Sequence, residues 1–225
     1  MERYLRKLIS EGENQKLDFK YCISDSRKIA RTLSAFANTD GGKLLIGVRD
    51  NGSIAGVRSD EEYYMIETAA SLFCRPEIPV EIRQHVADGK TVLEVEVNKG
   101  ENRPYEAKGE DGKWKAYFRK GDQNLLANGV LLHLWRKKER KTGVLIRFGK
   151  AEKILMEHLK NNGSITLSAF RKMAKIPSFR AEKIIVNLML CDILEMEASE
   201  KGFRYVLSQK AAAEDLPGNS PRQQK

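Results

Sequence analysis

Apolar and polar positions follow a mixture of helical and strand-like patterns over the first 143 residues. Apolar residues recur at helical spacing in four segments, which are 1–9, 27–38, 61–73 and 128–141. Between them lie short stretches of alternating apolar and polar residues bounded by glycine-containing turns, as half-buried strands are. Pairing across such turns predicts an α+β domain over residues 1–143, with a mostly antiparallel sheet.

Two local features of this domain give specific predictions. Ser26 precedes the second helical segment and is placed to cap it. The Asp-Asn-Gly sequence at 50–52 is a strong turn signal between the apolar segments 43–48 and 53–57. These two segments are therefore expected to pair as the strands of a hairpin.

The pattern changes after residue 143 to three helices and a hairpin. Helical spacing covers 150–160, 167–174 and a segment from Ser178, and strand-like alternation covers 193–196 and 203–207. Three helices followed by a hairpin predict a winged-helix domain over residues 144–208, a variant of the helix-turn-helix. The polar end of the chain, residues 209–225, holds two prolines and is expected to be a disordered tail.

The composition adds a strong positive charge. The chain of 225 residues has 40 Lys and Arg against 31 Asp and Glu, a formal net charge of +9. Such an excess attracts polyanions, either nucleic acid or an acidic membrane surface. No apolar run approaches the roughly 20 residues that span a bilayer, and the start lacks the apolar segment of a signal peptide. We therefore expect nucleic acid as the partner, with no membrane contact.

The cysteines indicate a reducing compartment. Cys22, Cys74 and Cys191 are widely spaced and odd in number, which argues against both a disulfide framework and a zinc site. They are expected to be small buried apolar side chains. A cytoplasmic protein fits these features.

Basic residues gather where a winged helix would meet nucleic acid. The stretch 136–141 holds five bases and one acid, and is either a solvated helix end or a strap that contacts phosphates. The third helix of a winged helix enters the major groove, while the preceding helix and the hairpin tip contact the backbone. The candidate contacts are Arg136, Lys137, Lys138, Arg140, Lys141, Arg171, Lys172, Lys175, Ser178, Arg180, Lys183, Asn187, Lys201 and Arg204. Alternatively, the domain serves protein contact or dimerisation, because function resides in the site rather than in the fold.

A long ordered motif occupies the start of the chain. It begins with Glu-Asn-Gln-Lys-Leu-Asp-Phe-Lys at 13–20 and continues with Ser-Ala-Phe-Ala-Asn-Thr-Asp-Gly-Gly-Lys-Leu-Leu-Ile-Gly-Val-Arg-Asp-Asn-Gly at 34–52. Together with Lys-Ala-Tyr-Phe-Arg-Lys-Gly-Asp-Gln at 115–123, it resembles the Schlafen AlbA-like domain, also called a divergent AAA or DNA-binding domain. The resemblance covers most of residues 11–127 and implies this fold for the N-terminal domain.

The resemblance also implies a nuclease site, because nuclease-active Schlafen proteins cut RNA with three carboxylates and a divalent metal. The matching residues are Glu13, Asp18 and Asp50, whose oxygens suit Mg²⁺ or Mn²⁺. Lys20 would add a positive charge beside the leaving group. Asp18 stands where the family usually has Glu, which moves the carboxylate back by about 1.5 Å and weakens such a reaction. Alternatively, Asp50 is a turn residue, and Asp18 pairs with Lys16 or Lys20.

The glycine pair at 41–42 does not make a phosphate loop. Gly41-Gly42-Lys43 lacks the spacing of G-x-x-x-x-G-K-[ST], and Leu44 follows the lysine. The family is sometimes labelled ATP-binding, but these residues do not support nucleotide hydrolysis. A tight turn between helix and strand is the expected role of the glycines.

Three functions remain after these considerations. Bacterial members of the family commonly carry a C-terminal helix-turn-helix and are catalogued as transcriptional regulators, so the leading expectation is a DNA-binding regulator without catalysis. RNA is the less favoured nucleic acid. The second expectation is an RNA or DNA endonuclease that depends on Mg²⁺ or Mn²⁺, and the third is a winged-helix protein-interaction module. The resemblance further implies a homodimer, since family members often form dimers.

Overall fold

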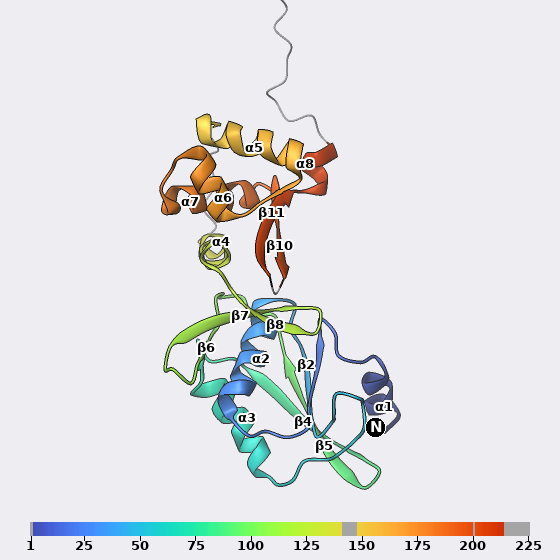
Figure 1. Cartoon of the computed structure of the whole chain (residues 1–225). Helices are drawn as coiled ribbons and strands as arrows, with labels where there is room; N and C mark the ends of the chain where they lie inside the picture. Colours follow the sequence, from blue (N-terminus) through green and yellow to red (C-terminus); the bar gives the residue numbers. More distant parts are fainter. Residues whose placement is uncertain (1, 141–147, 200, 214–225) are drawn as a thin grey trace, which may run out of the picture. The chain divides into compact units, whose positions relative to one another are not determined.

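The computed structural model describes residues 2–140, 148–199 and 201–213 (Figure 1). They form two compact units that divide between Ala127 and Asn128. The sequence placed this division at residue 143. The difference lies in helix α4 (Gly129–Glu139), whose apolar residues pack against helix α7 (Ser178–Leu190) and so join the second unit.

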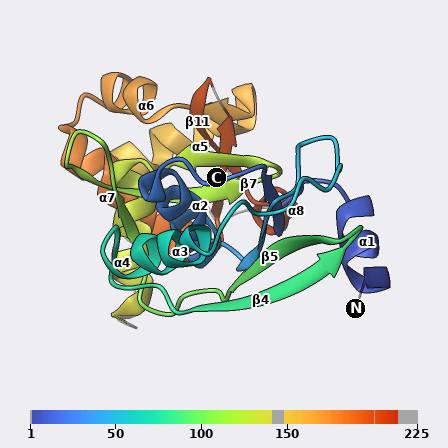
Figure 2. The same ribbon diagram turned by 90° about the horizontal axis from the view of Figure 1, so that it is seen from below.

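The first unit contains a sheet of order β1-β2-β5-β4. Its strands are β1 (Leu17–Lys20), β2 (Gly42–Ile46), β5 (Lys90–Val97) and β4 (Val80–Ala87). β1 and β2 are parallel and the other pairs antiparallel. One face buries Leu17, Phe19 and Leu45 against Leu5 of helix α1 (Glu2–Ser10). Helix α1 lies beside one end of the β4–β5 hairpin (Figures 1 and 2), where Arg6 pairs with Asp88.

A second sheet in the same unit has the order β3-β6-β7-β8. Its strands, all antiparallel, are β3 (Cys74–Arg75), β6 (Glu106–Lys108), β7 (Trp114–Lys120) and β8 (Gln123–Leu126). Helix α2 (Ser26–Asn38) contacts both sheets and is buried over most of its length, including its polar residues Thr32, Ser34 and Asn38. Helix α3 (Glu61–Ser71) packs beside it. A mixed architecture of helices and mainly antiparallel strands is therefore confirmed.

Of two local predictions in this unit, the N-cap of α2 was wrong and the hairpin around residues 50–52 forms only in part. The N-cap of α2 is Asp25, whose carboxylate accepts a hydrogen bond from the Arg27 N–H at 2.9 Å, and Ser26 is the first helical residue. The turn at 50–52 forms, because the Gly52 N–H donates to the Arg49 carbonyl at 2.8 Å. Between residues 53–57 and the chain that follows β2, the described pairing is a single antiparallel bridge between Val48 and Ile54. The two segments diverge after it, because the Val57 N–H donates instead to the Thr91 carbonyl of β5.

The second unit contains the helices and hairpin that the sequence indicates. After α4 come α5 (Lys150–Asn162), β9 (Ser164–Ile165), α6 (Leu167–Ala174), α7, β10 (Leu194–Ser199), β11 (Gly202–Leu207) and α8 (Gln209–Ala213). The sheet order is β10-β11-β9. Tyr205 lies at the centre of the unit, and burial raises the pKa of its hydroxyl to about 12 while Asn128 hydrogen-bonds to it.

The first residues of the segment expected to be a disordered tail form a helix instead. Residues 209–213 form α8, with Ala211 buried and its N–H bonded to the Ser208 hydroxyl at 3.1 Å. The expected disorder of residues 214–225, and the candidate contact Lys141, lie outside the described residues. No described helix combines the length and the apolar composition that a membrane crossing requires.

Candidate functional site

Two of the three expected carboxylates come together with Lys20 on β1 and the turn before it. Asp18 faces α2 and is 3% exposed. One of its oxygens lies 2.9 Å from the Lys20 ammonium, which in turn lies 4.0 Å from a Glu13 oxygen. The pairing of Asp18 with Lys20, expected as the alternative to a metal site, is therefore present.

A buried arginine from β7 occupies the other side of Asp18. Arg119 is 2% exposed, and its Nη2 lies 3.3 Å from the second Asp18 oxygen. The same guanidinium donates to the carbonyls of Asn14 and Leu17 and to the side chain of Asn124. Asp18 thus has a cation on each oxygen, and its negative charge is neutralised within the protein.

Glu13 is held by the backbone of β1. Its carboxylate accepts a hydrogen bond from the Phe19 N–H at 2.9 Å. Burial raises the pKa of Glu13, and the nearby Asp18 carboxylate raises it further, against the lowering effects of the Phe19 N–H and Lys20.

Asp50, the third expected carboxylate, differs from Asp18 and Glu13 in its surroundings. It is exposed and sits in the turn closed by the hydrogen bond between Gly52 and Arg49. Over the residues that the structure describes, no group of three His, Cys, Asp or Glu side chains converges to hold a metal ion. The arrangement of Asp18 between two cations does not fit a divalent ion, because the ion would have to displace Arg119 and Lys20.

Much of the family-like motif joins α2 to the second sheet. The Asn38 amide donates to the carbonyls of Tyr105 and Tyr117 at 2.7 and 2.8 Å, and its oxygen accepts from the Tyr105 N–H at 2.8 Å. Ser34 bonds to the same two residues, and the Thr39 hydroxyl accepts from the Arg119 N–H. Because unpaired buried polar groups are costly, these side chains are structural.

The glycine pair at 41–42 is also structural. Gly41 has a φ of +71°, and a Cβ there would lie 2.6 Å from the Val97 carbonyl oxygen. A Cβ on Gly42 would lie 2.5 Å from the buried ring of Phe36. The two glycines therefore permit close packing between the end of α2, β2 and β5.

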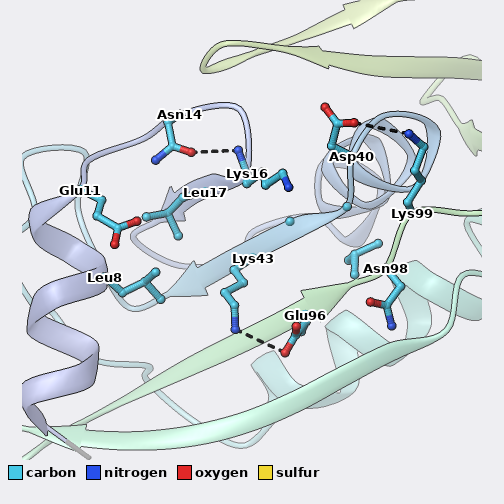
Figure 3. Close-up of a pocket in the computed structure, with 13 residues that line it drawn as sticks. Leu8, Glu11, Asn14, Lys16, Leu17, Asp40, Lys43, Glu96, Asn98 and Lys99 are labelled. Carbon is cyan, nitrogen blue, oxygen red and sulfur yellow. Dashed lines mark hydrogen bonds and ion pairs between the residues drawn. The ribbon is translucent and has the colours of Figure 1, made fainter.

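A cavity of about 310 Å³ opens beside these glycines (Figure 3). Three lysines and three carboxylates line it. Lys43 pairs with Glu96 at 3.3 Å and Lys99 with Asp40 at 3.5 Å, as the dashed lines in Figure 3 mark. Lys43 also pairs with the buried Glu94. The charges in this cavity are thus largely balanced among themselves, and it has no excess that would attract a polyanion.

The candidate nucleic-acid contacts of the second unit are mostly exposed. Exposed side chains are those of Arg136, Lys138, Arg140, Arg171, Lys172, Lys175, Ser178, Arg180, Lys183, Lys201 and Arg204. Lys137 and Asn187 are half-buried and contact each other. The Lys137 ammonium donates to the Asn187 side-chain oxygen at 2.7 Å. Asn187 is therefore engaged by α4, and Arg204 donates to the Ser164 hydroxyl at 3.2 Å.

Five of these cations lie close together in sequence on helices α6 and α7. From Thr166 to Leu190 the sequence has five bases and one acid. Among the described residues, no carboxylate forms an ion pair with any of the five. Beside them, Phe179 is 72% exposed and Met173 is 37% exposed. These two apolar side chains were not singled out from the sequence. Both lie off the apolar stripe of their helix, and this position could have predicted their exposure.

The comparison with protein families identifies the N-terminal unit. The family model described as Schlafen, AlbA_2 matches residues 13–128, just over half of the chain, and the chain belongs to this family. No curated protein matches the chain.

Two solved structures are similar to this chain. One is the DIP2311 protein from Corynebacterium diphtheriae, with a TM-score of 0.46 and 18% identity over 88% of this chain. The chain spans 39% of the length of that protein. The other is the N-terminal domain of an ATP-dependent DNA helicase RecG-related protein from Nitrosomonas europaea, with a TM-score of 0.38 and 23% identity. It is matched over 56% of this chain and 95% of its own.

Proposed function

We propose that this protein binds nucleic acid, and that it acts as a DNA-binding transcriptional regulator without catalysis. Membership of the Schlafen AlbA_2 family supports the association with nucleic acid. The observation that carries the proposal is the set of five exposed cations on α6 and α7, none of which forms an ion pair with a carboxylate of the described residues. Phosphate groups would supply the missing counter-charge, and their binding releases condensed ions from the nucleic acid.

The order of elements in the second unit supports a winged helix as the binding domain. The described order is α5, β9, α6, α7 and the β10–β11 hairpin, with β9 paired to β11. In such a domain α7 would enter the major groove. Its buried side carries Ile184, Ile185 and Leu188, while Arg180 and Lys183 are exposed. Arginine is a residue type that reads guanine edges, so Arg180 is the proposed base contact.

The other candidates are assigned to the DNA backbone. Arg171, Lys172 and Lys175 are exposed at the end of α6, and Lys201 is exposed at the turn of the hairpin. Exposed cations without a carboxylate partner suit phosphates, which fix orientation rather than sequence. The exposed bases of the 136–140 segment are proposed to extend the same set of contacts.

Binding of double-stranded DNA is the first test. We expect a fluorescently labelled duplex to bind at low salt, with an affinity that falls steeply as salt rises, by a slope of about 0.9 for each phosphate contacted. Fluorescence anisotropy at several salt concentrations measures both quantities. A single strand and a structured RNA of matched length serve as comparisons. Absence of duplex binding at the lowest salt would overturn the proposal, and tighter binding to RNA would replace DNA with RNA as the partner.

Metal-dependent cleavage is the second test. We expect no cutting of RNA, single-stranded DNA or duplex DNA with Mg²⁺ or Mn²⁺ beyond that seen with EDTA, because Asp18 is paired with Arg119 and Lys20. Gel electrophoresis of end-labelled substrates measures it. Cutting that requires Mn²⁺ and disappears in Asp50→Ala would establish instead the endonuclease of Glu13, Asp18 and Asp50.

A further inference from the structure

Two arginines lie against one exposed tyrosine at the carboxyl end of β1. The guanidinium carbon of Arg49 is 4.8 Å from the centre of the Tyr21 ring, and that of Arg58 is 5.3 Å from it. Arg58 also donates a hydrogen bond to the Tyr21 hydroxyl at 3.1 Å. Tyr21 is 39% exposed, and both arginines are exposed. The three residues form a cluster, here called the Tyr21 cluster, that faces solvent.

The backbone holds the members of the Tyr21 cluster in place. The Lys20 carbonyl accepts hydrogen bonds from the N–H groups of Gly47 and Val48, so the chain leaving β2 passes beside Tyr21. The Arg49 N–H donates to the Ser53 carbonyl at 3.0 Å. Glu62, which is 4% exposed, accepts from the Arg58 N–H at 2.6 Å and fixes the start of α3. The two arginines are therefore positioned by hydrogen-bonded turns.

The positive charge of the Tyr21 cluster is compensated only in part, by the Glu62 carboxylate that acts on Arg58 without forming an ion pair with it. Within the described ranges, neither guanidinium forms an ion pair with a carboxylate, and this includes Asp50, the next residue after Arg49. Arg6, Arg75 and Arg83 in the same unit all pair with carboxylates. Two like charges close together repel, and the face of one tyrosine offsets only part of that repulsion. The hydrogen bond and charge of Arg58 also lower the pKa of Tyr21. An anion is the ligand that this arrangement favours.

We propose that Tyr21, Arg49 and Arg58 bind phosphate groups of a single nucleic-acid strand. Guanidinium groups match phosphate oxygens with paired hydrogen bonds, and arginine held against an aromatic ring loses less freedom when it binds. The Tyr21 cluster is open to solvent, whereas a small phosphate compound is usually enclosed in a pocket. An open cationic surface that contacts the phosphate backbone is typical of single-strand binding. The site belongs to the N-terminal unit, so its binding does not depend on α7.

The test is the affinity of the full chain for a labelled oligothymidylate. Arg49→Gln combined with Arg58→Gln is expected to weaken binding about tenfold or more at low salt, because two charge-assisted contacts are lost. The salt slope should fall by about 0.7 for each lost contact. Tyr21→Leu, which removes the support for both arginines, should weaken binding in the same direction, and Tyr21→Phe should weaken it less. Circular dichroism checks that each variant is folded.

The control is Arg83→Gln, since Arg83 is an exposed arginine that already pairs with Glu81 and Glu96. Its oligothymidylate affinity should stay within about twofold of the wild type. Arg83→Gln removes one charge and the double variant removes two, so a loss of binding free energy in Arg83→Gln at least half that of the double variant would reduce the effect to net charge and overturn the proposal. Unchanged affinity and salt slope in the double variant would also overturn it.

Competition distinguishes a strand from a small phosphate compound. Inorganic phosphate and AMP should displace the labelled strand only at concentrations far above those of unlabelled oligothymidylate, because a strand offers several phosphates. Displacement by either small compound at concentrations as low as those of the strand would overturn the assignment to a nucleic-acid strand. The two proposals can fail separately. If the wild type does not bind duplex DNA, but the Arg49 and Arg58 double variant still loses affinity for oligothymidylate, the proposed function of α7 is refuted and the Tyr21 cluster remains supported.

Discussion

Arg119→Met should destabilise the N-terminal unit by about 3 kcal/mol, because it leaves the buried carboxylate of Asp18 with one cation fewer. Loss of one partner from a buried ion pair typically costs about 3–5 kcal/mol, and we expect the lower end because Lys20 remains 2.9 Å away. The variant also leaves the carbonyls of Asn14 and Leu17 without the donors that Arg119 supplies. Methionine fills similar space, so the effect reports charge and hydrogen bonding.

Denaturant unfolding followed by tryptophan fluorescence measures this loss. The chain has two tryptophans, and Trp114 lies in the first unit and Trp135 in the second. A Trp135→Phe background therefore makes the signal specific for the N-terminal unit. Combining Arg119→Met with Asp18→Asn should cost less than the sum of the single changes, because the unpaired charge is gone. Arg83→Met, an exposed arginine, should cost no more than about 1 kcal/mol. Equal costs at positions 83 and 119 would refute the role of the buried pair.

Arg180→Gln combined with Lys183→Gln should weaken duplex DNA binding about 100-fold, as expected if α7 lies in the major groove. A good base contact contributes about 1–3 kcal/mol, and a lost phosphate contact adds to it. Both side chains are exposed and without ion pairs among the described residues, so the loss of folding stability should be small. The salt slope should fall by about 0.9 if Lys183 meets a phosphate. Fluorescence anisotropy with one duplex at several salt concentrations gives both values.

Lys153→Gln combined with Lys160→Gln is the matched control, because it also removes two charges and both lysines are exposed on α5 in the same unit. It should change duplex affinity by no more than about twofold. A control loss as large as that of the α7 variant would indicate attraction by overall charge rather than a groove contact. Full retention of duplex affinity in the α7 variant would exclude α7 as the binding helix and direct attention to the segment 136–140.

Local patterns were sufficient to place most elements. The helices over 27–38 and 167–174 were predicted within one residue, because one apolar stripe and its flanking turn residues are properties of a short segment. The strands of the β4–β5 and β10–β11 hairpins were also predicted, because alternation of apolar and polar residues on either side of a turn is a property of a short segment. The segment 53–57 pairs with 43–48 only around Val48 and Ile54, because the Val57 N–H donates instead to the Thr91 carbonyl of β5, and no pattern within the segment encodes that partner.

The sequence by itself determined the positions of the elements, the excess of positive charge, and the family-like motif that contains Glu13, Asp18 and Lys20. Only the tertiary structure decided what surrounds them. Arg119 reaches Asp18 across 101 residues of sequence, and Arg58 reaches Tyr21 across 37. Such partners meet because a sheet and a buried helix bring distant segments together. Electrostatic attraction depends on distance in space, and no sequence spacing reports that distance.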